Sequence, residues 1–197
     1  MTYIVQFFAM MLTALFIENI IFTRAFGTSW LLHIIRNPKE LFTATALLTV
    51  ITTVSSVIGY PLRRFADESE LSYVLVPMLY MGCIAVTYII VDLVMKKFMQ
   101  KLFKKVYGTL GAASFNCAVL GALLVPTIER LDLLSTIGYS FGMSLGFAFA
   151  VLIMGVGMER IRFCHVPKAF KGLPITLIYL GLLSLAFYGL IGHQLPT

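Results

Sequence analysis

The sequence predicts an all-α integral membrane protein, and three observations carry this prediction. Of the 197 residues, 59% are hydrophobic and only 12% are charged, about half the charged fraction that a soluble domain needs for its surface. The mean hydropathy is +0.93. The apolar residues also fall in blocks of about 20, which is the length that a helix needs to cross the hydrocarbon core. Because six such blocks use most of the chain, residues 1–197 are expected to form a single transmembrane domain.

The first block has no basic residues before it, so it is interpreted as a retained span and not as a cleaved signal. Backbone groups in lipid must be paired within the segment, and runs this long and this apolar therefore span as helices. The six predicted spans cover residues 3–22, 41–59, 72–95, 107–126, 133–158 and 173–191.

The basic residues are concentrated in alternate connections between the spans. Twelve of the 15 lysines and arginines lie in the first, third and fifth connections. The other three, Arg63, Arg64 and Arg130, lie in the even connections together with five acidic residues. Since cytoplasmic loops carry the excess of Lys and Arg, the odd-numbered connections are predicted to be cytoplasmic and both termini to lie outside a bacterial-type inner membrane. The net charge of +6 is thereby explained without a nucleic-acid partner.

The two halves of the chain share landmarks at a nearly constant offset. Asn19 corresponds to Asn116, segment 59–65 to segment 157–163, and Tyr80 to Tyr179. These matches predict two repeats, about residues 3–95 and 107–191, with coincidence in a narrow composition as the alternative. Three spans in each repeat invert the second repeat relative to the first, and such folds place the functional site where interrupted helices meet at mid-depth. The first and fourth spans are therefore predicted to be interrupted.

Several polar residues fall within the predicted spans. Asn116 has glycines on both sides, including Gly121, and an asparagine can cap a broken helix or bond across a helix interface. Glu18 is a candidate for an ion or proton path, because an ionisable residue inside a span is costly and is commonly functional. The alternative is that Glu18 pairs with Arg24 at the membrane surface. Asp92 is expected to pair with Lys96, one helical turn away.

Two further features concern the basic segment and the cysteines. Residues 96–105 (KKFMQKLFKK) interleave basic and apolar residues, which is typical of a juxtamembrane helix on anionic lipid, with a purely topogenic charge cluster as the alternative. Cys83 and Cys117 fall within spans and Cys164 in a cytoplasmic connection, so no extracytoplasmic disulfide is expected.

Motifs in the second half resemble the RnfA/NqrE subunits of ion-translocating electron-transport complexes, which comprise the Rnf ferredoxin:NAD oxidoreductases and the sodium-pumping NADH:quinone oxidoreductases. The resemblance is carried by segments 115–121 (FNCAVLG), 139–147 (YSFGMSLGF), 159–160, 166–174 (VPKAFKGLP) and 182–187. It is looser in the first half, where Glu18-Asn19 and Phe26-Gly27 are the anchors.

The resemblance implies a partner and a cofactor. In that family a homologous RnfE/NqrD-type subunit of opposite orientation packs alongside, and each subunit gives two cysteines to a shared [2Fe–2S] cluster. Cys117 matches one metal ligand, whereas Ser29 stands where the family has its second cysteine. Three outcomes are open: the cluster is lost, Cys83 replaces the missing ligand, or Ser29 is an oxygen ligand. The resemblance places the cofactor-binding residues at Cys117, Ser29, Asn19, Asn116, Gly27 and Gly121.

The leading hypothesis is a membrane subunit that couples electron transfer from ferredoxin or NADH to sodium or proton movement, with no catalytic residues of its own. A divergent structural or assembly paralogue without a redox centre is one alternative, and Ser29 favours it. A small-molecule permease or vitamin-importer subunit is another. The single tryptophan, Trp30, lies on the predicted cytoplasmic side, which counts against an outward-facing ligand pocket.

Overall fold

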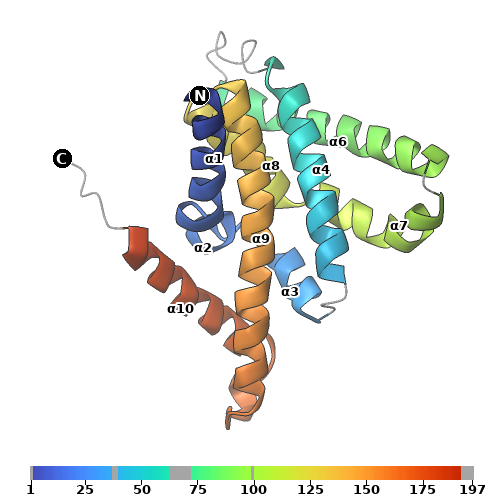
Figure 1. Cartoon of the computed structure of the whole chain (residues 1–197). Helices are drawn as coiled ribbons and strands as arrows, with labels where there is room; N and C mark the ends of the chain where they lie inside the picture. The colour runs from blue at the N-terminus through green and yellow to red at the C-terminus, as the bar shows by residue number, and fades with distance from the viewer. Residues whose placement is uncertain (1, 37–39, 63–71, 99, 192–197) are drawn as a thin grey trace.

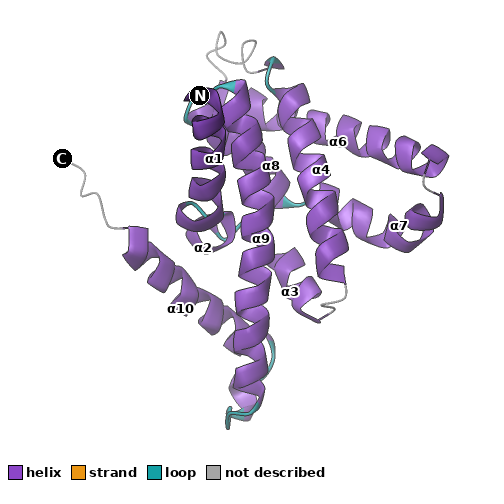
Figure 2. Ribbon diagram, viewed as in Figure 1, coloured by secondary structure: helices purple, strands orange, loops and turns teal. Residues whose placement is uncertain are grey.

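The computed structural model describes residues 2–36, 40–62, 72–98 and 100–191. Within these ranges all regular structure is helical, as Figure 2 shows. Length and composition allow four helical stretches to cross a membrane, and two shorter helices are also apolar. The predicted all-α membrane class is therefore confirmed. The four long stretches are Leu41–Gly59, Val74–Phe98, Tyr107–Ile128 and Leu133–Arg162, and the shorter two are Ile4–Ile17 and Leu173–Gly189.

The longest helix, α9 (Leu133–Arg162), forms the centre of the fold (Figure 1). Helix α1 (Thr2–Leu12) runs parallel to it, and two glycines of α9 lie against α1. A Cβ at Gly138 would lie 2.7 Å from the carbonyl oxygen of Phe7, and one at Gly142 would clash with the carbonyl oxygen of Met11. Small residues thus let the two backbones approach closely, as they do in helix pairs within lipid.

Helix α4 (Leu41–Gly59) packs on α9 in the antiparallel direction. Two buried hydroxyl pairs join the helices, Ser56 to Ser140 at 2.7 Å and Thr52 to Ser144 at 3.1 Å. Three of these four hydroxyls also lie within hydrogen-bond distance of a carbonyl oxygen in their own helix. The polar groups are therefore satisfied inside the apolar core.

The first predicted span is interrupted. Helix α1 continues as a single π-helical turn, η1 (Thr13–Ile17), and then stops at Glu18. Asn19 caps the short helix α2 (Ile20–Arg24), after which Ala25 and Gly27 take positive φ angles of 56° and 80°. The chain then forms α3 (Thr28–Arg36), a helix that lies within the predicted first connection.

The fourth predicted span is interrupted in the same manner. Helix α7 (Gln100–Ser114) ends before Phe115, and Asn116 caps α8 (Cys117–Ile128). Helix α7 therefore begins before the predicted start at residue 107, and it does not pass through Asn116. Both asparagines that stand out in the sequence are thus the residue immediately before a new helix.

The remaining helices spread away from this centre. In Figure 1, α6 (Ser72–Phe98) and α7 leave on one side of α9 and α10 (Leu173–Ile191) diverges on the other. The predicted pair of Asp92 and Lys96 is present at 2.6 Å. The basic segment 96–105 does not form a separate helix. It is divided between the end of α6 and the start of α7, because the apolar helix of the third span continues to Phe98.

Candidate functional site

The turn after α2 meets the second helix break at a hydrogen bond between the two halves of the chain. The backbone N–H of Gly27 donates to the Sγ of Cys117 over 3.0 Å, although the residues are 90 positions apart. Gly27 is buried in the turn between α2 and α3, and Cys117 is the exposed first residue of α8. This thiol faces outward and can reach a group outside the chain, and the thiolate is the form in which cysteine ligates metals.

Asn116 shapes the start of α8 beneath this thiol. Its Oδ1 accepts a hydrogen bond from the N–H of Ala118 at 3.2 Å, which is an ordinary N-cap, and Cys117 Sγ lies 3.6 Å from the same oxygen. The Nδ2 of Asn116 is buried and has no hydrogen-bond partner among the described residues, and the residue as a whole is only 8% exposed. A buried amide donor without a partner costs about 1–3 kcal/mol, so the site retains an unused donor beside the thiol.

Gly27 is required by both conformation and space. Its φ of +80° belongs to the left-handed region, and an added Cβ would lie 3.0 Å from the Cβ of Ala118 and 3.4 Å from Oδ1 of Asn116. The backbone N–H reaches the sulfur because no side chain separates the two segments.

Gly121, one turn further along α8, also lets residues of the first half approach this helix closely. A Cβ there would lie 2.6 Å from both the Cδ1 of Ile20 and the Cδ2 of Phe26. The structure thus brings together four of the predicted site residues, Gly27, Asn116, Cys117 and Gly121. The part that Ile20 and Ala118 play was not predicted, since nothing in an apolar run marks which side chains will lie against a glycine.

Asn19 has a different position and different partners. Its Nδ2 donates to the carbonyl oxygens of Leu15 at 3.0 Å and of Gly146 at 2.9 Å, and its Oδ1 accepts from the N–H of Ile21 at 3.2 Å. The side chain is fully buried. Asn19 therefore anchors the first break to α9, whereas Asn116 lies against Gly27.

The other sulfur and hydroxyl candidates lie in distinct surroundings. Ser29 is exposed on α3, two residues after Gly27. Cys83 is buried on α6 and lies between Tyr80 and Tyr88 in the sequence. The Tyr80 hydroxyl bonds to the Thr127 hydroxyl at 2.6 Å, and the Tyr88 ring packs on Phe115. Cys83 is therefore buried, whereas Cys117 is exposed. Among the described residues no group of three or more His, Cys, Asp or Glu side chains is placed to hold a metal.

Among the described residues, this donor set offers one exposed thiol as a ligand for a metal group. An iron–sulfur cluster of the [2Fe–2S] type takes four protein ligands, and the site offers one exposed thiol with an N–H bond to its sulfur and one exposed hydroxyl nearby in sequence. The residues do not fit a cluster held within this chain.

Glu18 lies at the first break and keeps a buried carboxylate oxygen, Oε2, without a hydrogen-bond partner. The expected ion pair with Arg24 is absent between these two described residues, so that alternative is wrong. Partial burial raises the pKa of Glu129, the residue after α8, and the charge of Glu18 raises this pKa further while Arg24 lowers it. Glu18 and Arg24, in the first half, thus both act on Glu129 in the second half.

Trp30 is a further residue whose role differs from expectation. It is buried in α3, and its ring stacks on Phe147 of α9 with centroids 5.0 Å apart. The tryptophan therefore anchors α3 to the central helix, and this role was unrecognised because α3 itself was not predicted.

The fold defines a helical membrane protein with two matched helix breaks, and comparison with known proteins places it in a family. Residues 7–193 match the family described as Rnf-Nqr subunit, membrane protein. The chain belongs to this family of membrane subunits.

Curated relatives cover nearly the whole chain. The RnfA subunit of the Na⁺-translocating ferredoxin:NAD⁺ oxidoreductase complex of Acetobacterium woodii is 28% identical over 94% of this chain and 96% of its own length. The RnfA subunit of the ion-translocating oxidoreductase complex of Alcanivorax borkumensis is 29% identical over 95% of this chain and 97% of its own length. The corresponding subunit of a Shewanella species is 27% identical over 95% of this chain and 97% of its own length. The resemblance that the motifs indicated is thereby confirmed.

Proposed function

We propose that this chain is the RnfA subunit of an ion-translocating oxidoreductase complex and that the face around Cys117 meets a second membrane subunit. The family match and the names of the relatives support the complex. The observation that carries the site is the Gly27 N–H bond to an outward-facing Cys117 Sγ. Family membership also favours this class over a permease or vitamin importer.

The proposal includes the architecture that the sequence predicts. Six spans form two inverted repeats of three, and the matching breaks at Asn19 and Asn116 support this arrangement. The positive-inside rule places both termini outside. Cysteines introduced near each end, in a chain lacking its own three, test the orientation with an impermeant reagent on intact cells. Labelling at both ends is expected, and labelling at only one would contradict the inverted repeat.

The partner is a homologous RnfE/NqrD-type subunit, and Cys117 gives one ligand to a [2Fe–2S] cluster shared with it. When bound, such a group accepts and releases one electron at a time. The residues of this chain orient the thiol, since Asn116 caps the helix that begins at Cys117. The N–H of Gly27 stabilises negative charge on the sulfur. Gly27 and Gly121 let α2 and Phe26 close over α8 and exclude water from this side.

Iron and acid-labile sulfide, counted per purified complex, test the redox part of the proposal. Cys117→Ser is expected to lower both in equal amounts and to remove one electron paramagnetic resonance signal. Cys83→Ser and Cys164→Ser are matched controls, because Cys83 is buried elsewhere and Cys164 lies beyond α9. Equal iron in Cys117→Ser and wild type would contradict a cluster at this thiol.

Ser29 favours a second candidate, an assembly subunit without a redox centre. Serine is a poor ligand for iron compared with a thiolate, and Ser29 is exposed where a second thiolate is expected. Ser29→Cys distinguishes the two functions. The assembly role would be established if the wild type has no cluster signal and Ser29→Cys gains one only when the partner subunit is present.

Glu18 is proposed to contribute to the ion path. A carboxylate oxygen that is buried and unpartnered beside a helix break can accept a cation or a proton. Glu18→Gln is expected to reduce ion uptake driven by electron transfer into proteoliposomes while complex assembly is retained. Glu159→Gln, at an exposed carboxylate near the end of α9, is the control. Unchanged uptake in Glu18→Gln would remove Glu18 from the path.

A further inference from the structure

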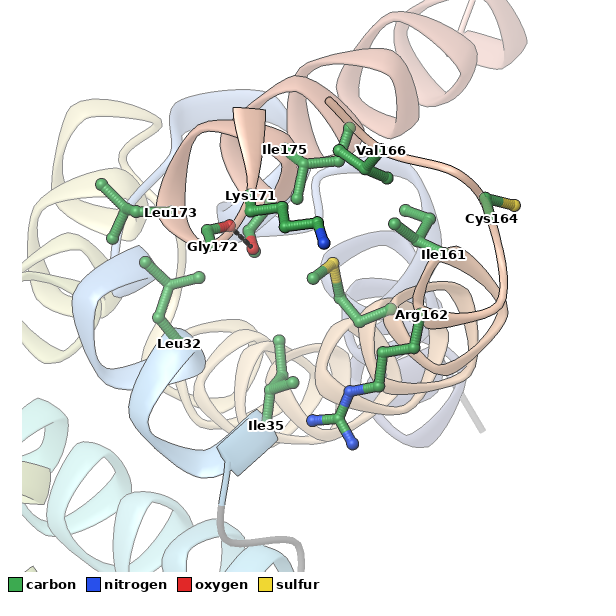
Figure 3. Close-up of a pocket in the computed structure, with 12 residues that line it drawn as sticks. Leu32, Ile35, Ile161, Arg162, Cys164, Val166, Lys171, Gly172, Leu173 and Ile175 are labelled. Atoms are coloured by element: carbon green, nitrogen blue, oxygen red, sulfur yellow. Dashed lines mark hydrogen bonds between the residues drawn. The ribbon is translucent and has the colours of Figure 1, made fainter. Parts of the chain in front are cut away.

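A cavity of about 430 Å³ opens between α3, the end of α9 and the start of α10 (Figure 3). It shares no residue with the site described above. Most of its walls are apolar side chains that belong to all three helices and to the connection between α9 and α10. These are Leu32, Ile35, Met158, Ile161, Val166, Leu173 and Ile175.

Two basic side chains line the same cavity. Figure 3 shows the ammonium group of Lys171 over the opening and the guanidinium group of Arg162 at the edge beside Ile35. No acidic residue is part of the lining, and neither cation has an ion-pair partner among the described residues. The cavity therefore combines hydrocarbon walls with two uncompensated positive charges.

The start of α10 adds to this positive potential. Gly172 and Leu173 lie at the amino end of a 19-residue helix, and both line the cavity with Thr176. The Thr176 hydroxyl donates to the carbonyl oxygen of Gly172 at 2.9 Å, so the wall is held at the helix start. An amino helix end carries a partial positive charge that favours anions, phosphate above all.

We propose that this cavity binds the phosphate headgroup of an anionic phospholipid. The phosphate lies between Lys171, Arg162 and the start of α10, and an acyl chain follows the apolar walls. Leu173 and Leu177 are exposed one turn apart on α10 and extend the apolar surface beyond the cavity. Basic pockets between membrane helices are sites where anionic lipids bind, and a lipid satisfies the charges and the apolar walls together.

The basic connection between α9 and α10 supports a lipid over a soluble anion. In the orientation proposed above, this end faces the inner leaflet, whose anionic lipids attract basic segments. A soluble phosphate would leave the seven apolar wall residues in contact with water. A transmembrane helix of a partner would fill the walls but would require acidic groups opposite Arg162 and Lys171.

The test uses the purified complex, re-equilibrated in detergent with equal amounts of phosphatidylglycerol and phosphatidylcholine of identical acyl chains. Lipid retained per complex is counted by mass spectrometry. In Arg162→Gln/Lys171→Gln the affinity for phosphatidylglycerol is expected to fall about 10–30-fold at this site, which is what removing two charge contacts implies. Arg160→Gln/Lys168→Gln is the matched control, because both residues are exposed in the same segment and line no part of the cavity.

Three results would overturn the proposal. The first is equal retention of phosphatidylglycerol in the two double variants, and the second is displacement of the lipid by inorganic phosphate. The third is a cross-link in the intact complex from Ile35→Cys, on the cavity wall (Figure 3), to another protein chain, because a protein segment would then occupy the cavity. Equal thermal unfolding of both variants in phosphatidylcholine alone checks that the fold is retained.

Discussion

Both helix breaks contain an asparagine that caps the following helix, but the two asparagine amides differ in their hydrogen bonding. Asn19 is fully buried and uses both ends of its amide, with two carbonyl acceptors and one N–H donor. Asn116 makes the corresponding cap at Ala118 but leaves its Nδ2 buried without a partner, next to an exposed thiol. The asparagine amide of the first break is satisfied by the chain itself, whereas that of the second break keeps an unpartnered donor among the described residues.

This difference indicates where a second molecule belongs. The Nδ2 of Asn116 lies inside the chain, so the outward-facing thiol of Cys117 is the group that another molecule can reach. The break at Asn19 is held by α9 and is structural. The break at Asn116 is oriented by the first half of the chain through Gly27 and presents Cys117 outward, so we propose this break as the part of the fold that meets another protein of the complex.

The largest expected effect follows from replacing Asn19. Asn19→Leu removes the cap of α2 and both hydrogen bonds that Nδ2 donates, to the carbonyl oxygens of Leu15 and Gly146. The isolated protein is expected to lose about 3 kcal/mol of unfolding free energy, measured by denaturant titration in mixed micelles. A loss no larger than that of Asn116→Leu would contradict the structural role of the first break.

The next effect concerns Gly27. Gly27→Ala places a side chain at a φ of +80° and against Ala118, and it is expected to cost about 1–2 kcal/mol and to move the N–H away from Cys117. Gly172→Ala is a matched control, because its φ is +90° but a Cβ there meets no atom within 4 Å. Slower alkylation of Cys117 is expected in Gly27→Ala alone, because the sulfur loses the N–H that stabilises its negative charge, and equal rates in both variants would argue against the contact.

Asn116→Leu is expected to change the stability of the isolated protein little. It removes a cap that contributes about 1 kcal/mol but also removes the unpartnered Nδ2. Assembly with the other subunits should suffer more than stability, so the variant is compared with Asn19→Leu by the yield of intact complex after size-exclusion chromatography. A variant that is strongly destabilised alone yet assembles normally would reverse the comparison.

The smallest effect is a pH dependence at Glu129. Partial burial, and then the charge of Glu18, raise the pKa of this carboxyl group, while Arg24 lowers it. The folded protein thus binds more protons than the unfolded chain between the ordinary and the raised pKa, so stability falls as pH rises through that window and levels off above it. Glu129→Gln is expected to flatten this fall in unfolding measurements from acidic to neutral pH, and an unchanged slope would show that Glu129 does not cause it.

Hydropathy and residue type predicted much of this fold because they report on the lipid environment. Apolar block length identified the class of protein, and the two asparagines within apolar runs marked both breaks. Helix α3 was missed because TSWLLHIIR is amphipathic and follows a charged residue, which is typical of a connection. Its burial depends on Trp30 reaching Phe147, a contact that no local pattern contains.

The sequence predicted which residues belong to the site, but it did not predict which of them contact one another. Family motifs indicated Gly27 and Cys117 separately, while the bond between them joins residues 90 apart and depends on Gly121 admitting Ile20 and Phe26. The same motifs grouped Asn19 with the cofactor residues, although its amide is already used by α9. Chain packing decides such cases, and packing is not encoded in short segments.

The reactivity of Cys117 with a membrane-permeant maleimide tests the central claim most directly. The measurement compares the isolated protein with the intact complex, in a chain carrying Cys83→Ser and Cys164→Ser so that only one thiol remains. If the second break opens toward a partner, Cys117 reacts in the isolated protein and is protected in the complex. Equal labelling in both would show that no neighbouring subunit covers this thiol, and the account of the site would be wrong.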